Sequence, residues 1–390
     1  MNILMVLDHE FPPDVRVENE MESLAEAGHK VHIACFTRKK NRKKTEEINA
    51  VTIHRKFIST FIYKTSVGCL KFPFYFNYWR RYLNRLFQIE KFNVIHIHDL
   101  PLAKIGHEFS KRHNIPLVID LHENWPALIE KASHTNTFSG RLLSSNRQWR
   151  NYEKKILQKA EVIIAVVEEM KQRLIKFGID EKKIIIISNT LNLDMFPLPD
   201  KQPDPNHTTL FYAGGLNIHR GIQTVIQSLV HIVPKIPNIR LWLVGEGSFR
   251  KELVKLVDRL NLKKYVVFFG WKPYDKMISL LSQTDIALIP HIKSDHTDST
   301  IPHKLFQYMY AQKPIVASNC LPIERFIKET KTGLIYKSND PVQLSGCIIN
   351  LIKNKDKFSF LQKNGKKWVK EKYNWDVDKK QLTLLYNELS

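Results

Sequence analysis

The stretch "STIPHKLFQYMYAQKPIVAS" (residues 299–318) predicts a helix followed directly by a buried strand. Pro302 suits the first turn of a helix, and apolar residues then recur at helical spacing. Residues 314–318 (PIVAS) form a short apolar run of the kind found in buried strands. Lys304 and Gln307 fall on the first turns of this helix. Because a helix start favours anions, these two side chains raise the question of which ligand they serve.

The alternation of helix and strand continues in both directions along the chain. Continuous apolar runs are typical of parallel strands that helices cover on both faces. The predicted strands contain NILMVL, KVHIACF, NVIHIHD, LVIDLHE, VIIAVV, KIIIIS, TLFYAGG, IRLWLVGEG, YVVFFGW, IALIP, PIVAS and GLIYK. Between KIIIIS and TLFYAGG, the segment "FPLPDKQPDPNH" (196–207) has four prolines and no periodicity, which predicts a linker. We therefore expect two doubly wound α/β domains, at 1–196 and 208–372, joined by a linker at 197–207.

The amino-acid composition indicates a folded and strongly basic protein. Of 390 residues, 43% are apolar, and 60 Lys and Arg against 39 Asp and Glu give a formal net charge of +21. This excess predicts an anionic partner: nucleic acid, anionic lipid or a phosphorylated small molecule. The four cysteines form no CxxC pair, the first residues lack the basic segment of a signal peptide, and no run is long enough to span a membrane. We therefore expect a cytoplasmic protein with reduced thiols.

Two segments of the first domain concentrate basic and aromatic side chains. "RKKNRKK" (38–44) is basic at six of seven positions, and residues 57–92 interleave rings with Lys and Arg. Within them, "FPFYFNYWRRYLNRLF" (72–87) is similar to an interfacial helix, whose rings lie at lipid headgroups and whose arginines bind lipid phosphate. Two alternatives stay open: the rings fill a core beside a solvated basic face, or they stack on nucleic-acid bases.

Polar residues end two predicted strands of the first domain. His98 and Asp99 follow one strand, and His122 and Glu123 follow the next. Since the carboxyl ends of parallel strands meet at one edge of a sheet, we expect these residues to lie close together. Two histidines and two carboxylates are metal-ligand types, but no pair has the i, i+4 spacing of a helical metal site, and we predict no metal. The first strand is not followed by GxGxxG, so an ordinary nicotinamide fingerprint is absent there.

A glycine turn in the second domain predicts phosphate binding. In "YAGGLNIHRG", Gly214 and Gly215 allow a phosphate to approach the backbone, and Arg220 offers a planar fork for its oxygens. The next strand ends in a further glycine-rich turn, "VGEG". Lys304 joins this set if its helix starts at the same edge of the sheet.

These motifs, in this order, resemble the family 4 glycosyltransferases, which are retaining enzymes with two facing Rossmann-like domains (the GT-B fold). The resemblance covers nearly the whole chain and is closest to a branch with PPDxRV and KLFEYM-like motifs. It rests on PPDVRV, VIHIHDLP, DLHENWP, LFYAGGLNIHRGI, LWLVGEGSFRKEL, VVFFGWKPYDKM, DIALIP and HKLFQYMYAQKPIVAS. It implies an acceptor-binding first domain, a nucleotide-sugar-binding second domain, and a C-terminal helix (373–390) that returns to the first domain.

The resemblance also implies roles for individual residues. His98 matches a histidine beside the donor sugar, the glycine turn and Arg220 match groups facing the diphosphate, and Trp271 with Lys272 match the position that holds the base. Together with the strand ends and turns described above, this gives His98, Asp99, His122 and Glu123 as the predicted catalytic residues. The predicted substrate-binding residues are Arg16, Gly214, Gly215, Arg220, Gly245, Glu246, Trp271, Lys272, Ser299, Lys304 and Gln307.

The chain departs from the family pattern at the E-x7-E motif. The two glutamates fall on Ser299 and Gln307, so neither position carries a carboxylate. An amide still bonds a ribose hydroxyl, and Asp295 and Asp298 in the same loop are the candidates to replace the missing acid. The usual arginine of the glycine turn is Gly215. The "DVD" at 376–378 is interpreted as a helix cap and not as a metal motif.

The expected function is transfer of a hexose, with retention and without a metal, from a UDP- or GDP-linked sugar. The expected acceptor is lipid-linked or a polysaccharide, in the synthesis of a cell-surface glycan such as lipopolysaccharide or capsule. The nucleotide sugar is a co-substrate, and no cofactor is predicted. We expect the protein to lie at the inner face of an anionic membrane and not to bind nucleic acid. Alternative functions are nucleic-acid binding, nucleotide-sugar epimerisation or hydrolysis on the same fold, and an inactive copy of the enzyme.

Overall fold

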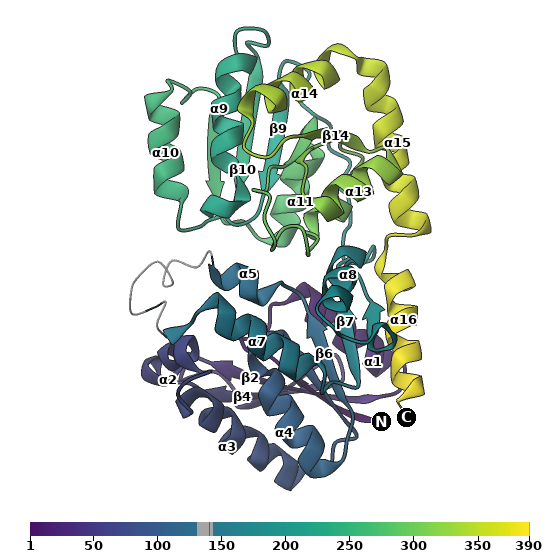
Figure 1. The fold of residues 1–390 in the computed structure, drawn as a ribbon. Coiled ribbons are helices and arrows are strands. Elements are labelled where there is room, and N and C mark those ends of the chain that lie inside the picture. Colours follow the sequence, from purple (N-terminus) through teal and green to yellow (C-terminus); the bar gives the residue numbers. More distant parts are fainter. Residues whose placement is uncertain (131–139, 141–142, 390) are drawn as a thin grey trace. The chain divides into compact units, whose positions relative to one another are not determined.

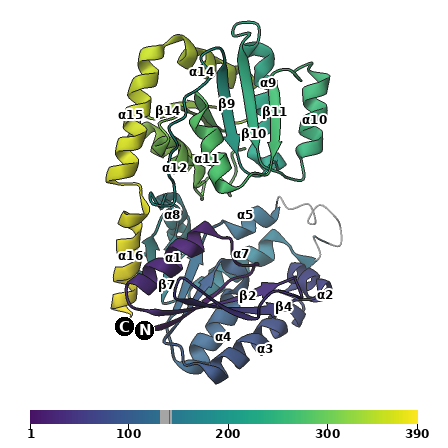
Figure 2. The same cartoon turned by 180° about the vertical axis from the view of Figure 1, so that it is seen from behind.

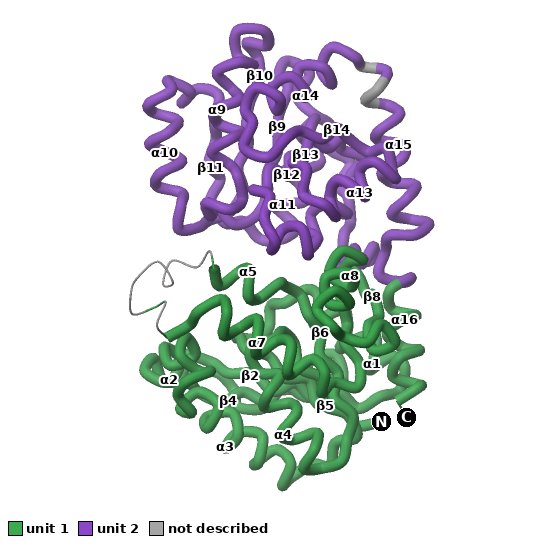
Figure 3. Tube along the Cα trace, viewed as in Figure 1, with its two compact units in different colours: residues 1–188, 378–390 green, residues 189–377 purple. Residues whose placement is uncertain are grey.

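The computed structural model describes residues 1–130, 140 and 143–389, which divide into two compact units (Figure 3). The first unit comprises residues 1–188 and 378–390, and the second comprises residues 189–377. Each unit is an α/β structure with helices on both sides of its sheet (Figure 1 and Figure 2).

The first unit is built on an eight-stranded sheet of order β3-β4-β2-β1-β5-β6-β7-β8, in which only the β3–β4 pair is antiparallel. Its strands are β1 (Asn2–Val6), β2 (Lys30–Thr37), β3 (Thr45–Ile48), β4 (Val51–Phe57), β5 (Val94–His98), β6 (Leu117–Leu121), β7 (Val162–Ala165) and β8 (Ile184–Ile186). Its helices are α1 (Val15–Glu26), α2 (Thr60–Lys64), η1 (Thr65–Gly68), α3 (Phe74–Ile89), η2 (Leu100–Leu102), α4 (Ala103–His113), α5 (Trp125–Glu130), α7 (Asn146–Leu157), α8 (Glu168–Lys176), η4 (Glu181–Lys183) and most of α16 (Trp375–Glu388).

The second unit is built on a six-stranded, all-parallel sheet of order β11-β10-β9-β12-β13-β14. Its strands are β9 (Thr208–Ala213), β10 (Ile239–Val244), β11 (Val266–Gly270), β12 (Ile286–Ile289), β13 (Ile315–Ser318) and β14 (Gly333–Tyr336). Its helices are η5 (Ile218–Arg220), α9 (Ile222–Ile232), α10 (Arg250–Arg259), α11 (Tyr274–Ser282), α12 (Lys304–Tyr310), α13 (Leu321–Thr330), α14 (Pro341–Lys353) and α15 (Lys355–Glu371).

Both sheets reverse their strand order next to their first strand. In the first sheet β1 lies between β2 and β5, and in the second β9 lies between β10 and β12. This is the doubly wound order, in which ligands bind beyond the carboxyl ends of the strands at the point of reversal. The predicted fold class, two Rossmann-like α/β domains, is confirmed, and ligand sites are expected at the ends of β1, β5, β9 and β12.

The strands at these points are buried, as their apolar sequences predict. All five residues of β5 and of β6 are buried, as are all four of β12 and of β13. Residues 299–318 form α12 and then β13, although the helix begins at Lys304 and not at Pro302. Lys304 therefore lies at the first position of its helix.

The boundary between the units differs from the expected one. Residues 189–207, including the proline-rich segment, belong to the second unit. The ring of Phe196 packs edge-on against Tyr274 and Tyr310, and Lys201 donates a hydrogen bond of 3.0 Å to Ser279 Oγ. The segment is thus attached to α11 and α12 over part of its length, which its proline content does not indicate.

The start of α16 corrects one detail of the sequence analysis. The capping side chain is Asn374, whose Oδ1 accepts a hydrogen bond of 3.2 Å from Val377 N. Asp376 lies in the first turn, and Asp378 Oδ1 accepts from Ser188 N at 3.3 Å. The DVD run therefore follows the cap and does not supply it.

The aromatic stretch of the first unit divides between core and surface. On α3 the rings of Tyr75, Phe76, Trp79 and Tyr82 are buried. The core-filling interpretation therefore holds for these four rings, whereas Phe72 and Phe74 are exposed. Among the described residues, no helix combines the length and the apolar composition that crossing a membrane requires.

Candidate active site

Polar residues of the first unit gather at the carboxyl ends of β1, β5 and β6. These strands are neighbours in the sheet and pair in parallel. Asp8 follows β1, His98 is the last residue of β5 with Asp99 after it, and His122 follows β6. The structure thus brings His98, Asp99 and His122 together, as the sequence predicts. Glu123 follows His122 at the same strand end and is partly exposed.

Asp99 has an unusual backbone conformation. Its φ of 62° and ψ of 164° lie in a region that residues other than glycine rarely adopt. Asp99 N donates to the carbonyl of Asp120 at 2.7 Å, and Asp99 Oδ1 accepts from His122 N at 3.0 Å. Strain of this kind costs about 1–3 kcal/mol and is concentrated at functional sites. It therefore supports this edge of the sheet as a site.

Asp120 is the centre of the cluster, although the sequence analysis did not single it out. It is fully buried, its Oδ2 lies 2.7 Å from His122 Nε2, and His98 Nδ1 lies 3.2 Å from the same nitrogen. The signal was present in the alternation of β6, because residues 120 and 122 share one face of a strand. Glu20, on α1, is also fully buried and was likewise missed.

Arg16 neutralises Asp120 from α1. Its Nε and one terminal nitrogen each donate a hydrogen bond of 2.8 Å to the Asp120 carboxylate, and the other terminal nitrogen donates to the carbonyls of Ile187 and Ser188. Because Arg16 is only 5% exposed, these contacts bind it within the first unit. The structure thus places Arg16 as the partner of Asp120, whereas the sequence analysis assigned it to the substrate.

The charges in this cluster support one another. Although burial acts in the opposite direction, Arg16 and His122 hold the pKa of Asp120 well below its usual range. Burial likewise opposes the charged form of His122, but Asp120 and then Asp99 raise the pKa of His122 to about 10. Asp120 is therefore ionised and His122 protonated at neutral pH.

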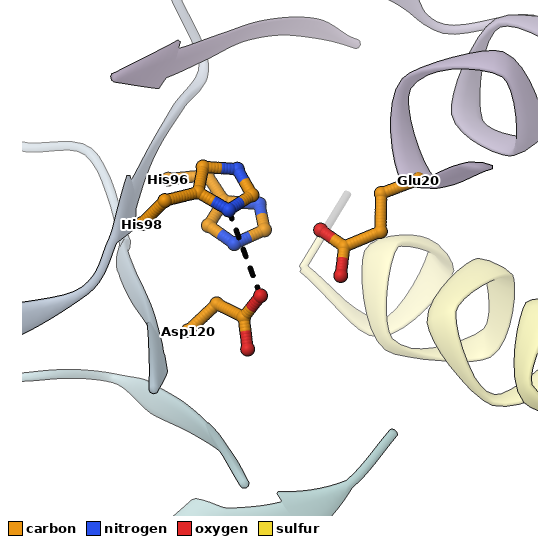
Figure 4. A group of neighbouring side chains, drawn as sticks. All are labelled: Glu20, His96, His98 and Asp120. Atoms are coloured by element: carbon orange, nitrogen blue, oxygen red, sulfur yellow. Dashed lines mark ion pairs between the residues drawn. The ribbon is translucent and has the colours of Figure 1, made fainter. Parts of the chain in front are cut away.

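Four side chains of metal-ligand type lie close together here: Glu20, His96, His98 and Asp120 (Figure 4). One potential ligand atom from each lies within 4.8 Å of the others. However, the Arg16 guanidinium forms ion pairs with both carboxylates, 3.1 Å from Glu20 and 2.8 Å from Asp120. A divalent ion needs this negative charge, so these residues do not fit one, and no step of the chemistry below uses a metal.

The glycine turn of the second unit follows β9 and contacts Lys304. Gly214 has φ +139°, and a Cβ added to it would lie 2.5 Å from Lys304 Nζ. Gly245, with φ +133°, packs so closely on the carbonyl of Gly214 that a Cβ there would overlap it. The ring of Tyr212 lies 4.0 Å from Lys304 Nζ, and the Tyr212 hydroxyl donates to the carbonyl of Gly215 at 2.9 Å. Gly245 is thus required by close packing against backbone, and Gly214 by its positive φ.

Arg220 and Lys304 make this turn positively charged. Burial and the nearby Arg220 lower the pKa of Lys304 well below its usual value. One terminal nitrogen of Arg220 lies 3.2 Å from His291 Nε2, where the ring accepts a hydrogen bond. Within the described part of the chain, neither cation forms an ion pair with a carboxylate. Two basic side chains held together at a glycine turn, without a carboxylate partner among the described residues, form a site for an anion.

Gln307 and Ser299 are both occupied within the second unit. The Gln307 amide nitrogen donates to the Tyr274 hydroxyl at 3.1 Å and lies 3.1 Å from His303 Nδ1. Ser299 Oγ donates to the carbonyl of Asp295 at 2.7 Å. The amide nitrogen of Gln307 is thus engaged by two side chains of the second unit.

One candidate for the missing carboxylate has a structural role. Asp298 Oδ1 accepts from Leu321 N at 2.8 Å, at the start of α13, and Asp298 Oδ2 lies 3.4 Å from Lys293 Nζ.

The remaining predicted substrate-binding residues lie at the ends of β10 and β11. Gly245 N donates to the carbonyl of Gly270 at 2.8 Å, next to Trp271, which is 71% exposed. Glu246 forms an ion pair of 3.5 Å with Arg250, and Lys272 is partly exposed.

Comparison with known proteins agrees with this architecture. Residues 14–195 match the family described as Glycosyltransferase Family 4, and residues 198–368 match the family described as Glycosyl transferases group 1. An uncharacterized glycosyltransferase of Methanocaldococcus jannaschii, MJ1069, is 25% identical over 242 residues, which are 60% of this chain and 60% of that protein.

Two solved structures have the same fold over the whole chain. A sucrose-phosphate synthase from Thermosynechococcus elongatus superposes with a TM-score of 0.83 at 18% identity, covering 100% of this chain and 98% of that one. Anabaena HepE in complex with UDP-glucose superposes with a TM-score of 0.74 at 16% identity, covering 100% of both chains.

The fold and the matches define a glycosyltransferase of the GT-B class. Since the two family matches together extend from residue 14 to residue 368, the chain belongs to the GT-B glycosyltransferases of the family 4 type.

Proposed function

We propose that the protein transfers a hexose from a UDP- or GDP-linked sugar to a hydroxyl acceptor, with retention of configuration and without a metal. The observation that carries this proposal is the anion site of Gly214, Arg220 and Lys304 at the end of β9. The UDP-glucose in the HepE structure and the family match support a nucleotide-sugar donor.

The charge of the site fits the chemistry of the leaving group. Cleavage of the sugar–phosphate bond transfers an electron pair to the diphosphate, so negative charge grows on its oxygens as the bond breaks. Preorganised cations and N–H groups stabilise that charge where it develops, and one such donor contributes about 100- to 1,000-fold in kcat. Arg220 and Lys304 supply these cations without a metal.

A thermal-shift series with UDP-, GDP- and ADP-sugars tests donor binding. The true donor raises the Tm of the wild type, and Arg220→Ala abolishes the shift because the diphosphate loses its fork. The matched control is Arg240→Ala, since Arg240 is in the same unit but pairs with Asp204 at the surface. A full shift in Arg220→Ala contradicts the proposed diphosphate site.

Product analysis separates transfer from its alternatives. The anomeric coupling constant of the product establishes retention, and the requirement for an acceptor distinguishes a transferase from an epimerase or hydrolase. Activity that survives chelation with EDTA supports the metal-independent reaction. Inversion, or turnover without an acceptor, contradicts the proposal.

We further propose that the first unit docks on an anionic membrane, where a lipid-linked acceptor would lie. Exposed rings surround α2 and the start of α3: Phe57, Phe61, Tyr63, Phe72 and Phe74. The basic segment 38–44 lies beside them, because the Arg38 guanidinium is 4.9 Å from the Tyr63 ring and the Lys40 ammonium is 6.0 Å from the Phe57 ring. Rings flanked by cations suit the boundary between headgroups and acyl chains.

Liposome flotation tests this membrane contact. Binding to vesicles with phosphatidylglycerol should exceed binding to neutral vesicles, and it should fall when Phe61 and Phe72 are both changed to Ser. Phe360→Ser is the control, because Phe360 is also exposed but lies in the second unit. Equal binding to neutral and anionic vesicles contradicts the proposal.

A further inference from the structure

Three atoms meet at the end of β5 in an arrangement that restricts one proton. His122 Nε2 lies 2.7 Å from Asp120 Oδ2 and 3.2 Å from His98 Nδ1. His98 Nδ1 is 3.6 Å from Asp120 Oδ2, which is too long for a hydrogen bond. Within the described part of the chain, the hydrogen-bond neighbour of His98 Nδ1 is therefore His122 Nε2.

The charge of each ring decides where its protons lie. His122 is protonated at neutral pH for the reasons given above, so both of its ring nitrogens carry hydrogen. Burial lowers the pKa of His98 to about 4, so this ring is neutral and carries one hydrogen. A proton on His98 Nδ1 would face the proton on His122 Nε2. The hydrogen of His98 therefore belongs on Nε2.

We propose that Asp120 and His122 are positioning residues that hold His98 as its neutral Nε2–H tautomer. Arg16 fixes the Asp120 carboxylate through two hydrogen bonds of 2.8 Å. His98 Nε2 is buried and has no hydrogen-bond partner among the described residues. A buried N–H without an acceptor costs about 1–3 kcal/mol, so the tautomer leaves a donor available for a ligand oxygen.

The ring of His98 is also held against rotation. It stacks on His96, with ring centroids 4.3 Å apart and an interplanar angle of 19° (Figure 4). His96 is fixed in turn, because its Nδ1 lies 2.8 Å from the Tyr386 hydroxyl of α16. Glu20 faces the two imidazoles in Figure 4, but no hydrogen bond joins it to either ring in the described structure. The orientation of His98 thus depends on β6 and α16.

The use of this hydrogen-bond donor rests on the proposed function: His98 Nε2–H would bond an oxygen of a substrate bound to the first unit. The tautomer itself does not depend on that function. Nitrogen-15 NMR of the full-length protein, labelled on its histidines, reports which ring nitrogen carries the hydrogen at neutral pH. The spectrum of His98→Gln identifies the His98 signals by their loss.

The expected result is a protonated Nε2 and an unprotonated Nδ1 at His98 in the wild type. His122→Gln should let His98 exchange between tautomers. His54→Gln, which removes a histidine pair at the other side of the same sheet, should leave the His98 signals unchanged. A wild-type spectrum in which His98 carries hydrogen on Nδ1, or on both nitrogens, overturns the inference. The His98→Gln variant is needed only to assign the signals.

Kinetics distinguish this inference from the proposed function. If transfer occurs, His122→Gln should lower kcat about 100-fold, because the hydrogen bond that His98 gives to developing charge is lost. The KM for the nucleotide sugar should stay nearly unchanged. An unchanged kcat in a variant whose tautomer is lost overturns the positioning role. A wild type with the predicted tautomer and no transfer refutes the proposed function alone.

Discussion

Lys304 shows how a single side chain acquires its chemistry from its surroundings. In sequence it is one cation among 60. In the structure its ammonium lies between the Gly214 turn and the Tyr212 ring, with Arg220 nearby. Because burial and Arg220 disfavour the charged form, an anion that binds here restores it.

Donor binding should therefore take up protons. The free Lys304 has a lowered pKa, and a bound diphosphate raises it, so protons should be taken up at pH values that lie between the pKa of the free form and that of the bound form. Calorimetry of UDP binding in buffers of different ionisation enthalpy measures the uptake. Lys304→Met should abolish it, whereas Lys328→Met, at an exposed lysine of α13, should not. Uptake that persists in Lys304→Met contradicts the assignment.

The buried pair of Asp120 and His122 should make the first unit sensitive to alkali. The pKa of His122 is about 10 in the folded state and about 6.5 when unfolded, so the stabilising cation is fully present below about pH 6.5 and is lost as the pH rises through about 10. The Tm of the wild type should thus fall between these values more steeply than the Tm of His122→Gln.

His54→Gln is the control for this measurement. Burial lowers the pKa of His54, so its ring stays neutral across the alkaline range, and the variant should follow the wild-type slope. Equal slopes for the wild type and His122→Gln would show that His122 is not charged in the folded protein.

For single residues, the sequence predicted where a side chain lies in the fold better than it predicted which side chains it contacts. His98, Asp99 and His122 share a strand edge because alternation and parallel pairing place them there. Asp120, Glu20 and the inward turn of Arg16 were not predicted, since they depend on how α1 packs across the sheet.

Among the elements, the turn between β9 and η5 is the proposed binding site of the sugar donor. Its conformation depends on two residues with positive φ, Gly214 and Gly245, which also pack against each other. The sequence predicted a phosphate turn from the glycines together with Arg220. It did not indicate that residue 245, at the end of β10, must be a glycine because the Gly214 carbonyl packs against it.

Gly245→Ala should damage this turn. A Cβ at residue 245 would overlap the Gly214 carbonyl, and the positive φ adds strain, so we expect a loss of about 1–3 kcal/mol in stability and loss of donor binding. Urea unfolding and the thermal shift with UDP measure the two effects.

Gly346→Ala is the matched control for this substitution. Gly346 lies within α14, and an added Cβ would meet no atom within 4 Å. The variant should gain about 0.5–1 kcal/mol from helix propensity and keep donor binding. Destabilisation of both variants by the same amount would argue against a special role for the turn.

Aromatic stretches were the least predictable elements. Residues 72–87 were compatible with an interfacial helix and with a core helix, because both have an apolar face beside basic residues. Tyr75 and Trp79 turned out to be buried, whereas Phe72 and Phe74 are exposed. Only packing against neighbouring elements such as β4 and α4 separates these cases, and packing is not visible in composition.

At the scale of the whole molecule, the first unit is closed by the last residues of the chain. Tyr386 of α16 is fully buried and its hydroxyl bonds His96, while Lys379 pairs with Glu26. The two-domain architecture followed from the sequence because apolar runs restart after a proline-rich segment. The boundary between the units did not follow from the sequence, because residues 189–207 belong to the second unit through their packing.

Tyr386→Ala should destabilise the first unit by about 3–5 kcal/mol, because it removes a buried ring and leaves His96 without its partner. Leu384→Ala, on the same helix at a side chain that is 54% exposed, should change stability by less than about 0.5 kcal/mol. Chemical denaturation measures both. Similar effects of the two substitutions would contradict the packing of α16 described here.

The assignment of residues 378–390 to the first unit has a consequence during synthesis. A ribosome delivers every residue of the second unit before it delivers the helix that covers His96. Usually the N-terminal domain folds first. Here the second unit can finish folding before the first, because the first unit also needs residues 378–390.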